Sequence, residues 1–108
     1  MSAEPFVNIK YAVIEQAAAG TNTIVSAVAS KKIRVISWVL SLSVAGTAKF
    51  LNTGGAALTG VMLVGTTPAT CAGSVYGPLF ETTPGVGLDI TSVTGSAHGH
   101  LTYQEIAV

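Results

Sequence analysis

The chain has 108 residues, enough for one domain with one modest core. Charged residues make up only 9% of it, against about 25% in ordinary soluble proteins, and five basic residues balance five acidic ones. Nucleic-acid binding depends on neutralising phosphates, so this balance argues against a nucleic-acid partner. The mean hydropathy is +0.60, but glycines and prolines interrupt the longest uncharged stretch, 50–80, so we expect no membrane-spanning helix.

Alternating apolar and polar residues, bounded by turn residues, recur along the whole chain and predict strands. No comparable stretch has the periodicity of an amphipathic helix. In chain order, we expect strands over residues 6–16, 21–28, 32–44, 47–52, 57–64, 74–80, 86–93 and 98–108.

The run over residues 32–44 is the strongest strand pattern. Its large apolar residues Ile36, Trp38, Leu40 and Leu42 share one side, and the other side carries Val35, Val39 and small serines. We therefore expect the first side to lie in a core and the second to face a close neighbour.

About eight strands with no crossover helices between them predict an all-β protein, an antiparallel β-sandwich or jelly roll. We expect residues 1–5 to form an N-terminal arm, because Pro5 disfavours helix in the residue before it. Residues 6–108 are expected to form a single β-sandwich domain.

Two histidines separated by one residue, His98 and His100, would project from the same face of a strand, a spacing that metals can use. A zinc site needs about four ligands, and the sequence nearby offers only Asp89 and Glu105. We therefore expect turn or interface histidines and no cofactor. A metal shared between copies at an oligomer axis is the alternative.

Nothing in the sequence brings an acid, a base and a nucleophile together, so we expect no enzyme activity. The single aspartate is Asp89, the other carboxylates are scattered, and no Gly-x-Ser-x-Gly elbow is present. The one cysteine, Cys71, excludes an internal disulfide and has no basic neighbour to activate it. No secretion signal is visible at the N-terminus, which fits synthesis in a bacterial cytoplasm.

So few charges predict a poorly soluble free monomer, so we expect copies of the chain or another protein to cover much of its surface. The main charge cluster, Lys31, Lys32 and Arg34, could dock on an acidic protein surface. The arm could lie on a partner as well. The docking residues that we expect are Met1, Ser2, Ala3, Glu4, Pro5, Phe6, Lys31, Lys32 and Arg34.

Three motifs follow the strand at 36–44 and a glycine-rich hairpin: Phe80-Glu81-Thr82, Gly87-Leu88-Asp89-Ile90 and Gly99-His100-Leu101-Thr102-Tyr103. With them, roughly the last three quarters of the chain resembles small β-sandwich virion proteins of bacteriophages, in particular the decoration or cement proteins of tailed-phage heads. The resemblance implies Phe80 and Tyr103 as anchors of the sandwich and Leu88, Ile90 and Leu101 as core positions. It implies no catalytic residues.

The resemblance implies a structural virion protein that binds the outside of a phage head as a homotrimer and stabilises contacts between capsomers. Its partners would be other copies of itself and the major capsid protein, with no nucleic acid and no membrane. One alternative is a tail, neck or head-fibre subunit of a phage. A further alternative is a glycan-binding β-sandwich, for which Tyr76 and Tyr103 are the candidate aromatic residues.

Overall fold

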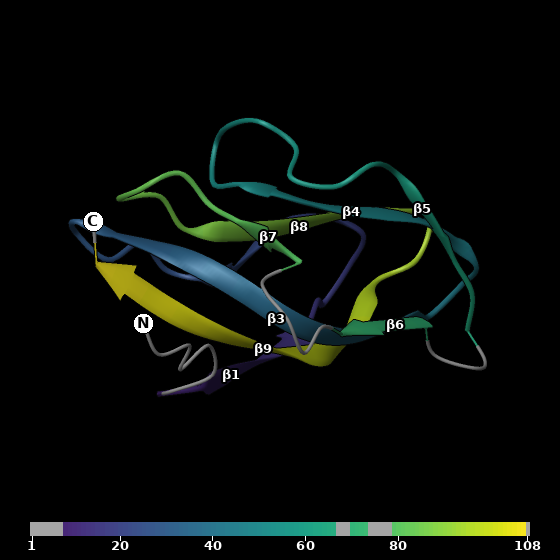
Figure 1. Ribbon diagram of the computed structural model, residues 1–108. Helices are drawn as coiled ribbons and strands as arrows, with labels where there is room; N and C mark the ends of the chain where they lie inside the picture. The colour runs from purple at the N-terminus through teal and green to yellow at the C-terminus, as the bar shows by residue number, and fades with distance from the viewer. Residues whose placement is uncertain (1–7, 67–69, 74–78, 108) are drawn as a thin grey trace.

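The computed structural model describes residues 8–66, 70–73 and 79–107, and it shows two β-sheets packed face to face (Figure 1). Eight strands form two four-stranded antiparallel sheets, and a ninth strand of two residues, β7, adds to the first sheet. The predicted all-β sandwich is therefore confirmed. The strands are β1 (Lys10–Glu15), β2 (Gly20–Val25), β3 (Lys31–Leu42), β4 (Gly46–Asn52), β5 (Met62–Val64), β6 (Thr70–Gly73), β7 (Phe80–Glu81), β8 (Leu88–Val93) and β9 (Ala97–Ala107).

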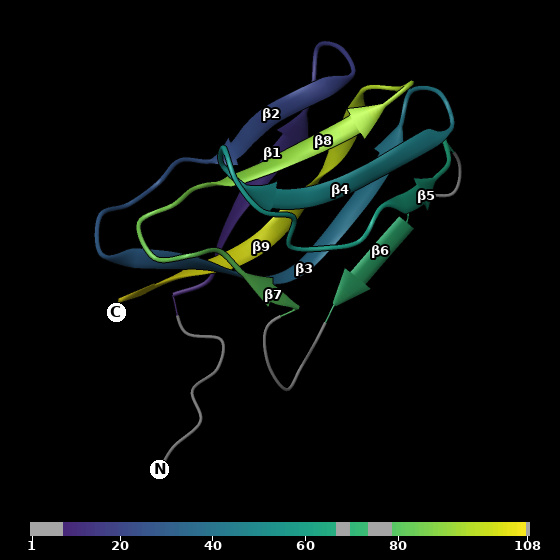
Figure 2. The same ribbon diagram turned by 90° about the horizontal axis from the view of Figure 1, so that it is seen from above.

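The strand order identifies a jelly roll. Sheet A has the order β1-β9-β3-β6, with β7 also paired to β3, and sheet B has the order β2-β8-β4-β5 (Figure 2). With β7 set aside, the first strand pairs with the last, the second with the second-last, the third with the third-last, and the two middle strands with each other. The chain is thus one long antiparallel hairpin rolled into two layers.

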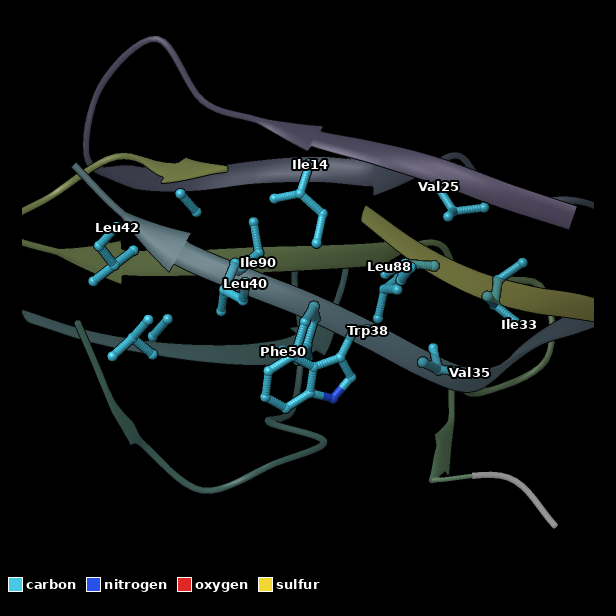
Figure 3. Close-up of a cluster of buried hydrophobic side chains, with 14 residues drawn as sticks. Ile14, Val25, Ile33, Val35, Trp38, Leu40, Leu42, Phe50, Leu88 and Ile90 are labelled. Carbon is cyan, nitrogen blue, oxygen red and sulfur yellow. The ribbon is translucent and has the colours of Figure 1, made fainter. Parts of the chain in front are cut away.

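The core lies between the two sheets and is built from large apolar side chains (Figure 3). Phe50 is its aromatic centre: its ring centroid lies 5.6 Å from that of Trp38 and 5.2 Å from that of Phe80. Burying each large apolar side chain contributes about 1.5–3 kcal/mol. The positions implied by the resemblance hold: Leu88, Ile90 and Leu101 are fully buried, and Phe80 and Tyr103 pack against the core.

A β-bulge in β3 overturns one prediction. The register between β3 and β9 shifts between Val35 and Ser37, so the core face changes from odd to even residue numbers at Ile36. Val35 is fully buried, not on the outer face as the alternation predicted, whereas Trp38 and Leu40 are in the core as expected. The inserted residue is why a strict period of two fails along this strand.

Two of the expected strands also differ from those of the structure. Within the run 57–64, only Met62–Val64 forms a named strand, β5. Leu58 and Thr59 instead donate their amides to the Phe50 carbonyl, and the Thr59 hydroxyl accepts a hydrogen bond from the Phe50 amide. The expected strand at 74–80 lies largely outside the described residues. The structure places β6 before it and β7 at its end.

A buried amide side chain ties the edges of the two sheets together. Gln16, which is 3% exposed, donates to the Gly20 carbonyl and to the Asn22 side chain, both in sheet B. Its Oε1 accepts from the Ser92 hydroxyl and from the Ala97 amide. All hydrogen-bonding positions of this amide are therefore used, as a buried polar group requires.

Candidate docking surfaces

Four of the five Lys and Arg side chains gather where β3 begins and β9 ends. Together with two glutamates they form what we call the cationic end. Its six residues are Lys10, Lys31, Lys32, Arg34, Glu81 and Glu105. Four positive charges less two negative charges leave this end with a formal charge of +2.

Each glutamate of the cationic end serves two cations. Glu81 lies 2.7 Å from the Lys32 Nζ and 2.7 Å from the Arg34 Nε, through a different carboxylate oxygen for each. Glu105 lies 3.2 Å from the Lys10 Nζ and 4.0 Å from the Lys31 Nζ. Because one carboxylate balances one cation, each group retains one surplus positive charge.

The Glu81 carboxyl shows the electrostatic effect of this arrangement. Desolvation alone would raise its pKa, but hydrogen bonds from Lys32 and Arg34, together with their charges, outweigh that effect. The pKa of Glu81 is therefore held below its ordinary value of 4.5. At neutral pH the group is ionised and the pairs are formed.

The three predicted docking cations lie at the same end of β3, and the structure adds partners to them, but Lys31 is on the opposite side of the strand from Lys32 and Arg34. Lys32 and Arg34 pair with Glu81, whereas Lys31 is only loosely bridged and its side chain is 41% exposed. An open hollow of about 300 Å³ lies beside Lys31 and is also lined by Asn8, Lys10 and Glu105. The other predicted docking residues, 1–6, lie outside the described residues.

The outward side of sheet A presents a different surface, which we call the uncharged face. Residues paired directly across antiparallel strands share a face, so its members follow from the register of β1, β9 and β3. The first row is Tyr11, Thr102 and Ser37, the second is Val13, His100 and Val39, and the third is Glu15, His98 and Ser41. Apart from Glu15, at the end of β1, these rows hold no Asp, Glu, Lys or Arg, so the centre of the face is uncharged.

The two candidate metal ligands belong to this uncharged face. His98 and His100 do project on the same side of β9, as predicted, and the His98 Nε2 lies 3.0 Å from the Ser96 hydroxyl. Among the described residues, no group of three or more His, Cys, Asp and Glu side chains is placed to hold a metal ion. A metal shared between copies stays a prediction of the sequence.

The residues considered for catalysis are not assembled either. Asp89 lies in sheet B, is 5% exposed, and accepts a hydrogen bond of 2.7 Å from the Thr53 hydroxyl. Both histidines lie in sheet A. The structure therefore does not place the Asp89 carboxylate and the imidazoles on a common sheet.

A smaller apolar surface lies on sheet B, at the opposite end of the sandwich from the cationic end. Thr47 pairs with Val93 on one side and with Leu63 on the other, which makes a row across β8, β4 and β5. Leu63 is 86% exposed, and Val44 is exposed nearby. We call Val44, Thr47, Leu63 and Val93 the apolar strip. An open hollow of about 460 Å³ lies beside it, lined by Ala45–Thr47 and Leu63–Gly65.

Sequence reasoning found the cations of β3 but missed Lys10, Glu81 and Glu105, which are distant in the chain. Only the pairing of β1 with β9 and of β7 with β3 brings them to the same place. The sequence gives the number of basic and acidic residues, but it does not show that four of the five cations lie at one end of the sandwich. Within the described part of the chain, no helix is long and apolar enough to cross a membrane.

Comparison with known proteins gives no relative for this arrangement: no family model, no curated protein and no solved structure matches the chain.

Proposed function

We propose that this chain is a structural virion protein, a decoration or cement protein that binds the outside of a bacteriophage head and stabilises contacts between capsomers. The proposal rests on the resemblance described above and on the kind of surface that the chain presents. Jelly rolls serve widely as the building blocks of viral shells, and also as lectins and cupins, so the fold alone does not select the function.

The observation that carries the proposal is the separation of a positively charged surface from exposed apolar surfaces on a chain with very few charges. The cationic end offers a surplus of positive charge, with Lys31 exposed beside an open hollow. Elsewhere the described surface exposes large apolar side chains such as Tyr11, Val13 and Leu63. A cement protein needs one surface for the shell and one for its own copies, and it needs no reactive site.

The cationic end is the surface that we assign to the shell. A surplus positive charge attracts an acidic surface and speeds the encounter with it. Weak contacts of this kind stabilise a shell when they are repeated over many copies, because each bound copy favours the assembled state. Lys31 is the central residue of this proposal, since its pairing with Glu105 is long and its side chain is accessible.

The test is the copy number of the chain in gradient-purified particles, measured by quantitative mass spectrometry against the major shell protein. Hundreds of copies per particle support a decoration or cement role. A few tens or fewer support the alternative of a tail, neck or head-fibre subunit. No copies overturn the virion proposal.

A matched pair of charge reversals then tests the docking surface. We expect Lys31→Glu to lower the number of copies bound per particle, because it reverses an exposed charge of the cationic end. Lys49→Glu is the control, since Lys49 lies on β4 away from that end. Equal loss of binding in both variants, or in neither, would contradict docking through the cationic end.

Glycan binding is the second candidate, and one hollow favours it. This open hollow of about 370 Å³ is lined by hydroxyl-bearing Thr23, Ser26 and Thr53 and by the backbone of 85–87. Of the two aromatic candidates, Tyr103 packs against the core and Tyr76 lies outside the described residues. A glycan-array signal that disappears on Ser26→Ala, a change at an exposed hydroxyl of this hollow, would favour this function over the structural one.

A further inference from the structure

The centre of the uncharged face has the composition of a buried surface but is open in the chain as described. Tyr11 is 74% exposed and Val13 is 62% exposed, and they alternate along β1 on the outward side. Small side chains, Ser37 and Thr102, lie beside Tyr11 and are joined by a hydrogen bond between their hydroxyls. Large apolar groups next to small paired hydroxyls form a surface on which another sheet can pack closely.

The position of β1 increases the exposure of this face. Within the described strands, β1 pairs only with β9 and forms the edge of sheet A (Figure 2). An edge strand with exposed alternating apolar residues tends to associate with another chain unless it is covered. Free proteins protect such edges with outward charges, and the outward side of β1 has only Glu15, at its far end.

We propose that a second copy of this chain packs on the uncharged face of sheet A. A partner for this face needs an uncharged surface that alternates large apolar and small polar side chains, and a second copy presents such a surface in its own rows. The inference goes beyond the virion role, because it concerns the purified chain in the absence of any particle.

The size of the face supports a copy of the chain as the partner. At ~3.3 Å per residue, the three rows of the uncharged face, from Ser37 to Ser41 along β3, span about 15 Å, and three strands spaced ~4.8 Å apart give a width of about 15 Å. The projected area of the uncharged face is therefore about 200–250 Å², and the whole outward side of sheet A, with its charged rim, reaches at most about 500–600 Å², towards the ~800 Å² per partner of a stable interface. The apolar strip on sheet B ends at β5, which has three residues, and offers only about 150 Å² by the same reckoning.

The charges around the uncharged face indicate how a second copy is oriented. Lys32 and Arg34 with Glu81 leave one surplus positive charge where β3 begins, and Glu15 lies at the opposite end of the same face. A copy whose strands run antiparallel brings each Glu15 towards the cationic end of the other copy. A parallel copy would place like charges together, which is unfavourable. The result is an uncharged centre with a charged rim, the usual anatomy of a specific interface.

The test uses sedimentation equilibrium of the full chain from about 1 to 100 µM, a range in which a specific oligomer dissociates measurably. We expect the wild type to be oligomeric at the upper concentrations. Tyr11→Lys and Val13→Lys each place a charge at the centre of the interface and should weaken association by at least about 30-fold. Both positions are largely exposed in the single chain, so a lysine can extend into water and leave the fold intact.

Leu63→Lys is the matched control, because it makes the same type of change at the most exposed large apolar side chain of sheet B. We expect its association constant to stay within about threefold of the wild type, as for residues outside an interface. A wild type that stays monomeric at all concentrations would overturn the inference. So would association that Leu63→Lys abolishes while Tyr11→Lys and Val13→Lys leave it unchanged. Neither result bears on the copy number in particles, so a failure here and a failure of the virion role can be told apart.

Discussion

The two halves of β3 present opposite kinds of surface to the outside. Before the bulge at Ile36, the outward side carries Lys32 and Arg34, which pair with Glu81 on β7. After the bulge, it carries Ser37, Val39 and Ser41, which have no charge. One strand therefore contributes both to the cationic end and to the uncharged face, and one inserted residue separates them.

The cationic end and the uncharged face differ in how far their own side chains stabilise them in water. The cationic end balances half of its positive charge locally, and every cation there has a carboxylate within 4.0 Å. The uncharged face leaves Tyr11 and Val13 in contact with water and has nothing within the described chain to cover them. The first region therefore tolerates solvent as a monomer, and the second gains most from a partner.

The largest effect that we expect comes from Gly99→Ala, which disturbs the uncharged face from within. Gly99 has a φ of 153°, and a Cβ there would lie 1.9 Å from the Val39 carbonyl oxygen on β3. Such a clash between neighbouring backbones, added to the strained φ, should cost about 3 kcal/mol or more of unfolding free energy. Denaturant unfolding followed by tryptophan fluorescence measures the cost.

Gly60→Ala is the control for that experiment, because a Cβ at Gly60 would meet no atom within 4 Å. We expect it to change the free energy of unfolding by less than about 0.5 kcal/mol. If Gly99→Ala were as mild as Gly60→Ala, the close approach of β9 to β3 would be wrong, and with it the register of the uncharged face.

The next prediction tests the bulge itself with one substitution at two positions. Val35→Thr places a hydroxyl in the core, where Val35 is fully buried, and should cost about 1–3 kcal/mol. Val39→Thr makes the same change on the partly exposed outward face and should cost less than about 0.5 kcal/mol. Equal costs in the two variants would mean that both valines face the same side, as a regular strand requires.

These valines also show how much of the fold the sequence could predict. The alternation of Trp38, Leu40 and Leu42 identified a strand with one buried face, because a period of two needs only local residues. The bulge, which places Val35 in the core, depends on the register with β9 some 70 residues away in the chain. A local pattern carries no information about that pairing, so the prediction failed on one side of Ile36 and succeeded on the other.

The surfaces were predictable to the same limited extent. Lys31, Lys32 and Arg34 are neighbours in sequence, and their clustering was predicted. Glu81 joins them only because β7 pairs with β3, and the role of Gln16 depends on four groups that the turn into β2 and the β8–β9 corner bring together. Polar networks of this kind are decided by tertiary contacts, which hydrophobic periodicity does not encode.

The smallest effect that we expect tests the cationic end through pH. Glu81→Gln removes the carboxylate that pairs with Lys32 and Arg34, and since the pairs are partly exposed it should cost at most about 1 kcal/mol near neutral pH. The pKa of Glu81 is lowered on folding, so its contribution is present above its ordinary value of 4.5 and is lost as the pH falls through the lower pKa of the folded state.

The difference in unfolding free energy between wild type and Glu81→Gln should therefore be constant from neutral pH down to about pH 5 and shrink as the pH falls below the ordinary pKa of 4.5 and through the lower pKa of the folded state. Glu15→Gln is the matched control in samples dilute enough to be monomeric, because Glu15 is an exposed carboxylate outside the cationic end, and we expect it to change the unfolding free energy by less than about 0.5 kcal/mol. A Glu81→Gln difference that grew on acidification would mean that the carboxyl is stabilised in its neutral form. The pairing of an ionised Glu81 with Lys32 and Arg34, which distinguishes the cationic end from the uncharged face, would then be contradicted.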